Sequence, residues 1–321
     1  MLKKIAKMLK SANKIAIFTH LNPDGDAIGS SFAMKYVLES MGKCATIYLE
    51  RPMPEKFSYL GDDYKIADEN AKIEADIALV LDCGEYSRLG KCEAACRSVL
   101  TVLCVDHHKT GGDFGKFYYN EPDAAATAQL VFKLANLLTK KIPTLAYEAI
   151  YTGMSTDTGH FKFSNVSPET FYIAGEILNA GINHRKITTI IYDTVKREKM
   201  IFLGEAAQRV EFYHDGRVAF LECYGDLLEK YGLTYEDVEE LPNVPLNLEG
   251  VEVAILVKDK DETSRRVSFR TKDVIDVSEV AKEFGGGGHK SAAACIISAN
   301  IEEEKEKLIN AVIKKLGEKD V

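Results

Sequence analysis

Residues 14–30 read KIAIFTHLNPDGDAIGS and combine the parts of one parallel α/β unit. The run KIAIFT has strand length and is rich in β-branched and aromatic residues. A polar loop follows, and an amphipathic segment then extends from Ala27 to Met41. The stretch therefore predicts a strand, a loop and a helix, and open α/β sheets bind their ligands where the strand meets the loop.

The same alternation continues to about residue 185. Further β-rich runs follow, most of them separated by helical segments or turns: ATIYLE, DIALVLD, LTVLCVD and KFYY. Helices are expected after Asp123, which can act as an N-cap, after Pro143, and after the pair Ser167–Pro168. The pattern predicts a first domain over residues 1–185, built on a parallel sheet.

The rest of the chain has a different pattern. Residues 183–213 read as helical and carry charges throughout, so 186–212 is predicted to be a helical connector. Residues 213–321 then predict a smaller mixed α/β domain from four β-rich runs: VAFLECY, VEVAILVKD, RRVSFRT and AAACIIS. Helices are expected near 225–240, over VSEVAKEF and over the terminal IEEEKEKLINAVIKKLG. Two domains also suit a length of 321 residues, which exceeds what one hydrophobic core usually organises.

Composition excludes several functional classes. The net charge of −8 argues against binding of long duplex DNA, which requires a broad basic surface. A small phosphorylated ligand remains compatible if bound metals and a few local cations supply positive charge. The apolar runs are only of strand length, so we expect no membrane segment and no signal peptide. Seven cysteines, several in apolar strands, indicate a reduced cytoplasmic protein.

Acids and histidines recur where the predicted strands and helices end: His20, Asp24, Asp26, Asp82, Asp106, His107, His108 and Asp157. Each aspartate alone is equally well explained as a helix cap. Together at one sheet edge they would repel one another unless cations neutralised them, and two divalent ions balance four carboxylates. Mixed carboxylate and imidazole ligands favour Mn²⁺, with Zn²⁺, Co²⁺ and Fe²⁺ as alternatives. Two such ions roughly 3.5–4 Å apart are typical of phosphoester hydrolysis.

Four segments resemble the motifs of the DHH phosphoesterase superfamily: HLNPDGDAIGS, LDCGEYSRLG, VDHH and STDTGHF. The resemblance implies one metal held by His20, Asp24 and Asp82. It implies a second metal held by Asp26, Asp82, His107 and Asp157, so that Asp82 bridges the two. It also implies that Asp82, His108 and Asp106 serve catalysis: His108 would contact the scissile phosphate, and Asp106 would hold a ligand histidine in its working tautomer.

The second domain also resembles the nanoRNase branch of this superfamily, the small oligoribonucleases that double as phosphatases of 3′-phosphoadenosine 5′-phosphate (pAp). The similarity lies in VSFR at 267–270 and FGGGGHKSAAA at 284–294. It implies that the substrate is bound by Arg270, Gly286, Gly287, Gly288 and His289. The glycines alone are weaker evidence, because a helix C-cap explains two of them. Arg265 and Arg266 are interpreted as a solvated turn in preference to a substrate contact.

The favoured function is metal-dependent hydrolysis of short oligonucleotides to nucleoside 5′-monophosphates, with pAp as a second substrate. Cyclic- or linear-dinucleotide phosphodiesterase activity is the first alternative, because it shares the motifs. A manganese inorganic pyrophosphatase is disfavoured, since it would require clustered lysines and arginines around a small anion. A nucleotide-binding module without turnover is disfavoured because all proposed ligands are present. The resemblance further suggests a homodimer formed through the first domain.

Overall fold

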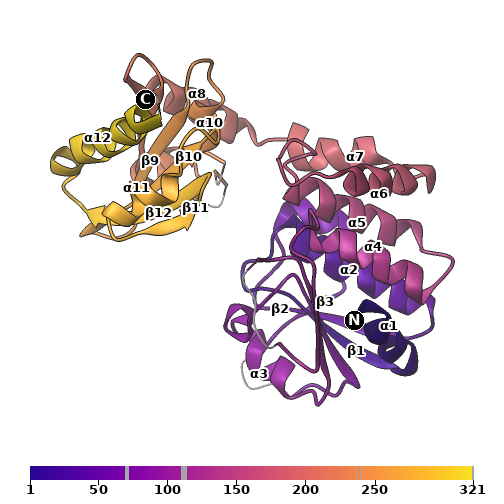
Figure 1. Cartoon of the computed structure of the whole chain (residues 1–321). Coiled ribbons are helices and arrows are strands. Elements are labelled where there is room, and N and C mark those ends of the chain that lie inside the picture. Colours follow the sequence, from indigo (N-terminus) through magenta and orange to yellow (C-terminus); the bar gives the residue numbers. More distant parts are fainter. Residues whose placement is uncertain (69–71, 110–113, 236, 239, 320–321) are drawn as a thin grey trace. The chain divides into compact units, whose positions relative to one another are not determined.

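The computed structural model describes residues 1–68, 72–109, 114–235, 237–238 and 240–319. The chain forms two compact units, Met1–Thr194 and Val195–Val321 (Figure 1). Residues 186–212 fall partly in each unit, and Phe202 and Ala206 from this segment pack into the core of the second. The finer division into two domains and a separate connector stays a prediction.

The first unit is built on the predicted parallel sheet, with strand order β3-β2-β1-β4-β5-β6. Its strands are β1 (Lys14–Phe18), β2 (Cys44–Leu49), β3 (Tyr64–Ile66), β4 (Ile77–Leu81), β5 (Val102–Asp106) and β6 (Phe117–Asn120). All neighbouring pairs are parallel, so the carboxyl ends of the strands share one edge. The α/β class predicted from the sequence is confirmed, although the three-residue strand β3 was not anticipated.

Helices cover both faces of this sheet (Figure 1). The unit contains α1 (Leu2–Ser11), α2 (Gly25–Ser40), α3 (Cys92–Arg97), α4 (Thr127–Leu138), α5 (Thr144–Asp157), α6 (Pro168–Asn179), α7 (His184–Thr188), the 3₁₀ turns η1 (Glu55–Leu60) and η2 (Tyr86–Leu89), and the π turn η3 (Thr189–Asp193). Helices α2, α4 and α5 pack on one face, and α3 lies on the other. Helix α6 begins with the predicted Ser167 cap, whose side chain accepts a hydrogen bond from the Thr170 N–H.

Helix α4 starts later than the sequence predicts. Asp123 was expected to cap it, but residue Ala126 is still extended and the helix begins at Thr127. The Asp26 carboxylate accepts hydrogen bonds from the N–H groups of Thr127 (2.6 Å) and Ala128 (2.8 Å). A side chain distant in sequence therefore satisfies donors that a local cap would otherwise have to satisfy.

The second unit is a mixed sheet with strand order β11-β12-β10-β9-β8-β7, in which only β8 and β9 are parallel. Its elements are α8 (Arg197–Gln208), β7 (Glu211–Tyr213), β8 (Val218–Cys223), α9 (Gly225–Lys230), α10 (Asn243–Leu246), β9 (Val253–Asp259), β10 (Ser264–Thr271), α11 (Val277–Glu283), β11 (Gly287–His289), β12 (Ala292–Ser298) and α12 (Ile301–Lys319). Residues 211–213, predicted helical, form an edge strand instead. The helix expected near 225–240 ends at Lys230. Within the described residues, no helix is long and apolar enough to span a membrane.

Candidate metal centre

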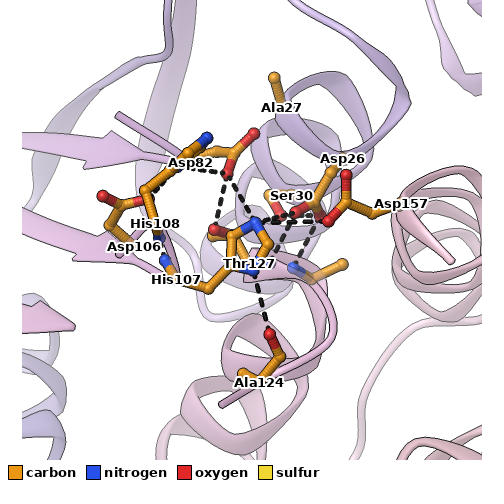
Figure 2. Close-up of polar contacts among 12 residues, drawn as sticks. Asp26, Ala27, Ser30, Asp82, Asp106, His107, His108, Ala124, Thr127 and Asp157 are labelled. Carbon is orange, nitrogen blue, oxygen red and sulfur yellow. Dashed lines mark hydrogen bonds and ion pairs between the residues drawn. The ribbon is translucent and has the colours of Figure 1, made fainter. Parts of the chain in front are cut away.

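Acidic and imidazole side chains from several segments meet at the carboxyl edge of the parallel sheet. Their ligand atoms form three groups, each lying within 4.8 Å: His20, Asp24 and Asp82; Asp26, His107 and Asp157; and Asp82, His107 and His108. Figure 2 shows Asp26, Asp82, His107 and Asp157 directed toward one another. All six residues that the sequence proposes as metal ligands thus lie together.

Asp82 lies between the first two groups. It follows β4 directly, is 2% exposed, and has φ of 58°, a left-handed conformation that aspartate tolerates better than most residues. One carboxylate oxygen is 3.6 Å from His20 Nε2, and the other is 3.7 Å from His107 Nε2. The two oxygens therefore face different groups, which is the position a bridging ligand needs.

His107 has one ring nitrogen fixed and the other directed into the cluster. Its Nδ1–H donates to the Ala124 carbonyl at 3.0 Å, so Nε2 is the unprotonated nitrogen of the neutral ring. Nε2 lies 3.3 Å from Asp157 Oδ2 and 3.9 Å from Asp26 Oδ2. A backbone carbonyl on the second nitrogen is the arrangement that orients histidines for metal binding.

Asp24 combines the two roles that the sequence left open. It is the N-cap of α2, because its Oδ1 accepts hydrogen bonds from the N–H groups of Asp26 (3.0 Å) and Ala27 (3.1 Å). The same oxygen lies 4.0 Å from His20 Nε2. A carboxylate can accept more than two hydrogen bonds or ligand contacts, so capping does not exclude metal binding.

His108 is held beside the cluster by Asp106. His108 Nδ1 lies 2.7 Å from Asp106 Oδ1, and the Tyr118 hydroxyl donates to Asp106 Oδ2 at 3.2 Å. The Asn120 amide donates to the His108 carbonyl at 2.9 Å. Because Asp106 engages Nδ1, the third geometric group, in which His108 would bind metal through that nitrogen, is disfavoured. The ring is left free to present Nε2. Asp106 was expected to orient a ligand histidine, but it engages the ring of His108, because the Ala124 carbonyl already holds the ring of His107.

The second unit brings Arg270 and His289 into one row. Ala292 of β12 pairs with Arg270 of β10 on one side and with His289 of β11 on the other. Directly paired residues in antiparallel strands project from the same face, so the two basic side chains flank a methyl group. The register places both side chains on one face of the sheet, and their joint binding of a substrate stays a prediction.

The glycine run adopts defined structure. Gly285 follows the C-cap of α11 with φ of 71°, and Gly287 and Gly288 belong to the short strand β11. A Cβ atom on Gly286 would lie 2.2 Å from the Ala294 carbonyl oxygen, and one on Gly288 would lie 2.5 Å from Ala293 Cα. Close packing against β12 therefore requires glycine at these two positions independently of any ligand.

Comparison with known proteins agrees with this geometry. The model of the DHH family, N-terminal domain, matches residues 14–154, and that of the DHHA1 domain matches 215–318. The bifunctional oligoribonuclease and PAP phosphatase NrnA of Thermus thermophilus is 30% identical, over 97% of this chain and 93% of that protein. The chain belongs to the DHH family of phosphoesterases.

Two solved structures have a fold similar to that of this DHH protein. An exopolyphosphatase-related protein from Bacteroides fragilis superimposes with a TM-score of 0.90 at 26% identity, covering 100% of this chain and 97% of that one. RecJ from Thermus thermophilus in complex with Mn²⁺ gives a TM-score of 0.50 at 13% identity, covering 97% of this chain and 54% of RecJ. The latter similarity concerns the fold alone.

The electrostatics of the clustered aspartates are suited to the binding of divalent cations. Burial raises the pKa of Asp26 well above its usual value, and Asp82 and Asp157 add to this effect. Burial also raises the pKa of Asp157, to about 7. Burial opposes ionisation of Asp82 as well, but His20, His107 and His108 hold its pKa below the usual value. Among the described residues, no lysine or arginine forms an ion pair with these carboxylates. Divalent metal ions would therefore fit as the positive charges that neutralise them.

This fit predicts pH-dependent stabilisation by metal. In the metal-free protein, ionisation of Asp157 costs stability as the pH rises from about 4, its pKa in an unfolded chain, to about 7, its folded value. A divalent cation held by Asp157 would compensate only for the ionised form. We expect Mn²⁺ to raise the thermal midpoint more near pH 8 than near pH 5, relative to EDTA.

The Asp157→Asn variant provides the control for this experiment. Because asparagine does not ionise, this variant in EDTA should not show the fall in stability between about pH 4 and pH 7 that ionisation of Asp157 causes in the wild type. Differential scanning calorimetry measures both proteins. Equal metal-induced shifts at the two pH values in the wild type would contradict the prediction.

The structure also places supporting residues around the cluster that the sequence does not predict. Thr127 donates its hydroxyl to Asp82 at 2.9 Å, and Tyr118 contacts Asp106 as described above. Gly153 of α5 allows close approach, because a Cβ there would lie 2.8 Å from Asp26 Oδ1. No local pattern marks Thr127 or Gly153, whereas the alternation in FYYN could have placed Tyr118 on the Asp106 face of the sheet.

Proposed function

We propose that this DHH protein is a divalent-metal-dependent phosphodiesterase that releases nucleoside 5′-monophosphates from oligonucleotides of a few nucleotides. Removal of phosphate from pAp is proposed as a second activity. The main support is the position of Asp82, whose two oxygens face two separate donor groups. Further support comes from the Thermus thermophilus relative, which is named for both activities.

We propose that His20, Asp24 and Asp82 would hold one metal, and Asp26, Asp82, His107 and Asp157 the other. Mn²⁺ is the first choice because the donor set mixes imidazole with carboxylate. A bound pair of divalent ions lowers the pKa of water and neutralises charge on the phosphate.

The protein side chains around the metals position the substrate. His108 would direct Nε2 toward an oxygen of the scissile phosphate, because Asp106 engages its Nδ1. The hydrogen bond to Asp106 raises the pKa of His108, which favours the ring form that carries protons on both nitrogens. An imidazolium there would stabilise negative charge on the phosphate or protonate the leaving oxygen.

Substrate choice is proposed to lie in the DHHA1 domain. Arg270 and His289 would bind a phosphate that is not cleaved, and the glycines 286–288 would let the ligand approach the backbone. Arg270 is half-buried and hydrogen-bonds only the neighbouring Phe269 carbonyl (3.0 Å) among the described residues. Its guanidinium therefore keeps donors for a phosphate.

A substrate panel with Mn²⁺ tests the proposed function. The panel compares a dinucleotide, a pentanucleotide, long RNA, pAp, a cyclic dinucleotide and pyrophosphate. Rapid hydrolysis of the two short oligonucleotides, with pAp slower and long RNA slowest, is the expected result. Preference for the cyclic dinucleotide or for pyrophosphate would overturn the proposal in favour of that activity.

The Arg270→Ala variant tests the division of labour between the domains. We expect KM for a dinucleotide to rise about 10- to 100-fold, the effect of losing a charged hydrogen bond, while bound metal is unchanged. Steady-state kinetics and metal analysis measure the two quantities. Arg209→Ala, which removes an exposed arginine paired with Glu205, is the control. Loss of metal from Arg270→Ala would contradict the assignment.

Assembly and location are proposed on narrower grounds. The sequence resemblance suggests a homodimer formed through the first unit, which size-exclusion chromatography with light scattering would test. A cytoplasmic location agrees with the presence of seven free cysteines.

A further inference from the structure

One face of the second sheet carries a row of polar and basic residues, in which Arg266 is exposed, Arg270 is half-buried and Ser268 is buried. Along β10, Arg266, Ser268 and Arg270 alternate with Val267 and Phe269. The two apolar residues are buried in the core beneath α11 and α12. The three polar residues therefore project from the opposite face of the strand.

Small side chains lie beside this row on β12. Arg266 pairs with Ile296, Ser268 with Ala294, and Arg270 with Ala292. Ile296 is 50% exposed, and the two alanines are partly exposed. These short neighbours leave this face of β12 partly exposed.

The two arginines of this row lack an acidic partner in the part of the chain that the structure describes. Among the described residues, no carboxylate forms an ion pair with Arg266 or Arg270, although the chain carries eight more negative than positive charges. Burial lowers the pKa of Arg270, and the charge of Arg266 lowers it further. Like charges on one face, without an ion pair to any described carboxylate, indicate an anionic ligand.

Arg265 shows the contrasting arrangement. It projects from the other face of β10, where its guanidinium forms an ion pair with Asp259 at 3.0 Å and lies over the Tyr224 ring at 5.2 Å. Arg265 and Arg266 were interpreted from the sequence as one solvated turn. Their side chains instead project from opposite faces of β10. Arg265 is neutralised within the fold, whereas Arg266 is available for binding.

We propose that Arg266 binds an additional phosphate of a longer oligonucleotide, beyond the scissile phosphate and the phosphate held by Arg270 and His289. Four residue-to-residue steps along the strand separate the Cα atoms of the two arginines by about 13 Å, which is farther than neighbouring phosphates lie apart. A dinucleotide anchored at Arg270 would then leave Arg266 unused. This inference rests on the proposed function for its ligand and makes Arg266 a determinant of length preference.

The Arg266→Ala variant tests this role, with Arg265→Ala as the matched control. We expect KM for a pentanucleotide to rise about 5- to 10-fold in Arg266→Ala, with unchanged kcat and an unchanged KM for a dinucleotide. Loss of one phosphate contact should also reduce the slope of log KM against log salt concentration by about 0.7. Arg265→Ala should change neither the length dependence nor the salt slope.

Binding of a fluorescent pentanucleotide in EDTA separates this inference from the proposed function. If the wild type binds the pentanucleotide and Arg266→Ala binds it more weakly, Arg266 has the inferred role even if no hydrolysis occurs with Mn²⁺. Equal binding by both proteins would overturn the inference, as would an equal loss for dinucleotide and pentanucleotide or no binding by the wild type. Arg266→Lys, which keeps the charge, should restore part of the affinity and of the salt slope.

Discussion

Replacement of Asp82 by Ala is expected to lower kcat for short oligonucleotides by about 10⁴-fold or more, the scale on which loss of a whole catalytic unit acts. Asp82 contacts both donor groups, with His20 near one oxygen and His107 near the other. Its removal therefore weakens both proposed metal sites together. The other candidate ligands belong mainly to one group, so their single replacements should leave one site better preserved.

Metal titration distinguishes this effect from unfolding. Isothermal titration calorimetry should show that Asp82→Ala binds fewer Mn²⁺ ions than the wild type, which is expected to bind two. In EDTA the variant should remain folded, because removing one buried carboxylate relieves repulsion on Asp26 and Asp157. Asp123→Ala, at an exposed position that does not cap α4, is the control. Full metal binding by Asp82→Ala would refute the bridging role.

The second large effect is expected for His108→Ala, with a fall in kcat of about 10²- to 10³-fold. The physical reason is the loss of the ring that Asp106 orients beside the proposed phosphate position. Mn²⁺ binding should remain at the wild-type level, since the Nδ1 atom of His108 is already engaged. Kinetics and calorimetry on the same preparation measure both quantities.

A loss of metal in His108→Ala would show that the third geometric group, Asp82, His107 and His108, is the one that binds. The exposed His184 provides the control, because its replacement by Ala changes a histidine of the same unit outside the cluster. Tyr118→Phe gives an intermediate case. It removes a hydrogen bond to Asp106 and should lower kcat less than loss of the ring itself.

Much of the fold could be predicted because it follows local periodicity. The run KIAIFT became β1, and the alternation of strands and helices gave the parallel sheet of the first unit. The candidate ligands were found for the same reason, since parallel strands deliver the residues at their carboxyl ends to one edge. Where the local signal was weak, as in the short strands β3, β7 and β11, prediction failed.

Two other errors share a different physical cause, which is that distant residues override local preferences. Asp123 has the chemistry of a cap, but α4 begins at Thr127 because the Asp26 carboxylate satisfies its first donors. Arg265 and Arg266 resemble a solvated turn in sequence, but pairing of β10 with its neighbours sends them to opposite faces.

The sequence by itself determined which residues end the strands, and hence which acids and histidines could form a metal centre. Only the tertiary structure decided how they are shared: the two oxygens of Asp82 face different groups, and Asp106 engages His108 through Nδ1. It likewise decided that Arg270 and His289 flank Ala292. Side-chain periodicity is a local property of the chain, whereas strand register and the direction of a carboxylate oxygen depend on packing between distant segments.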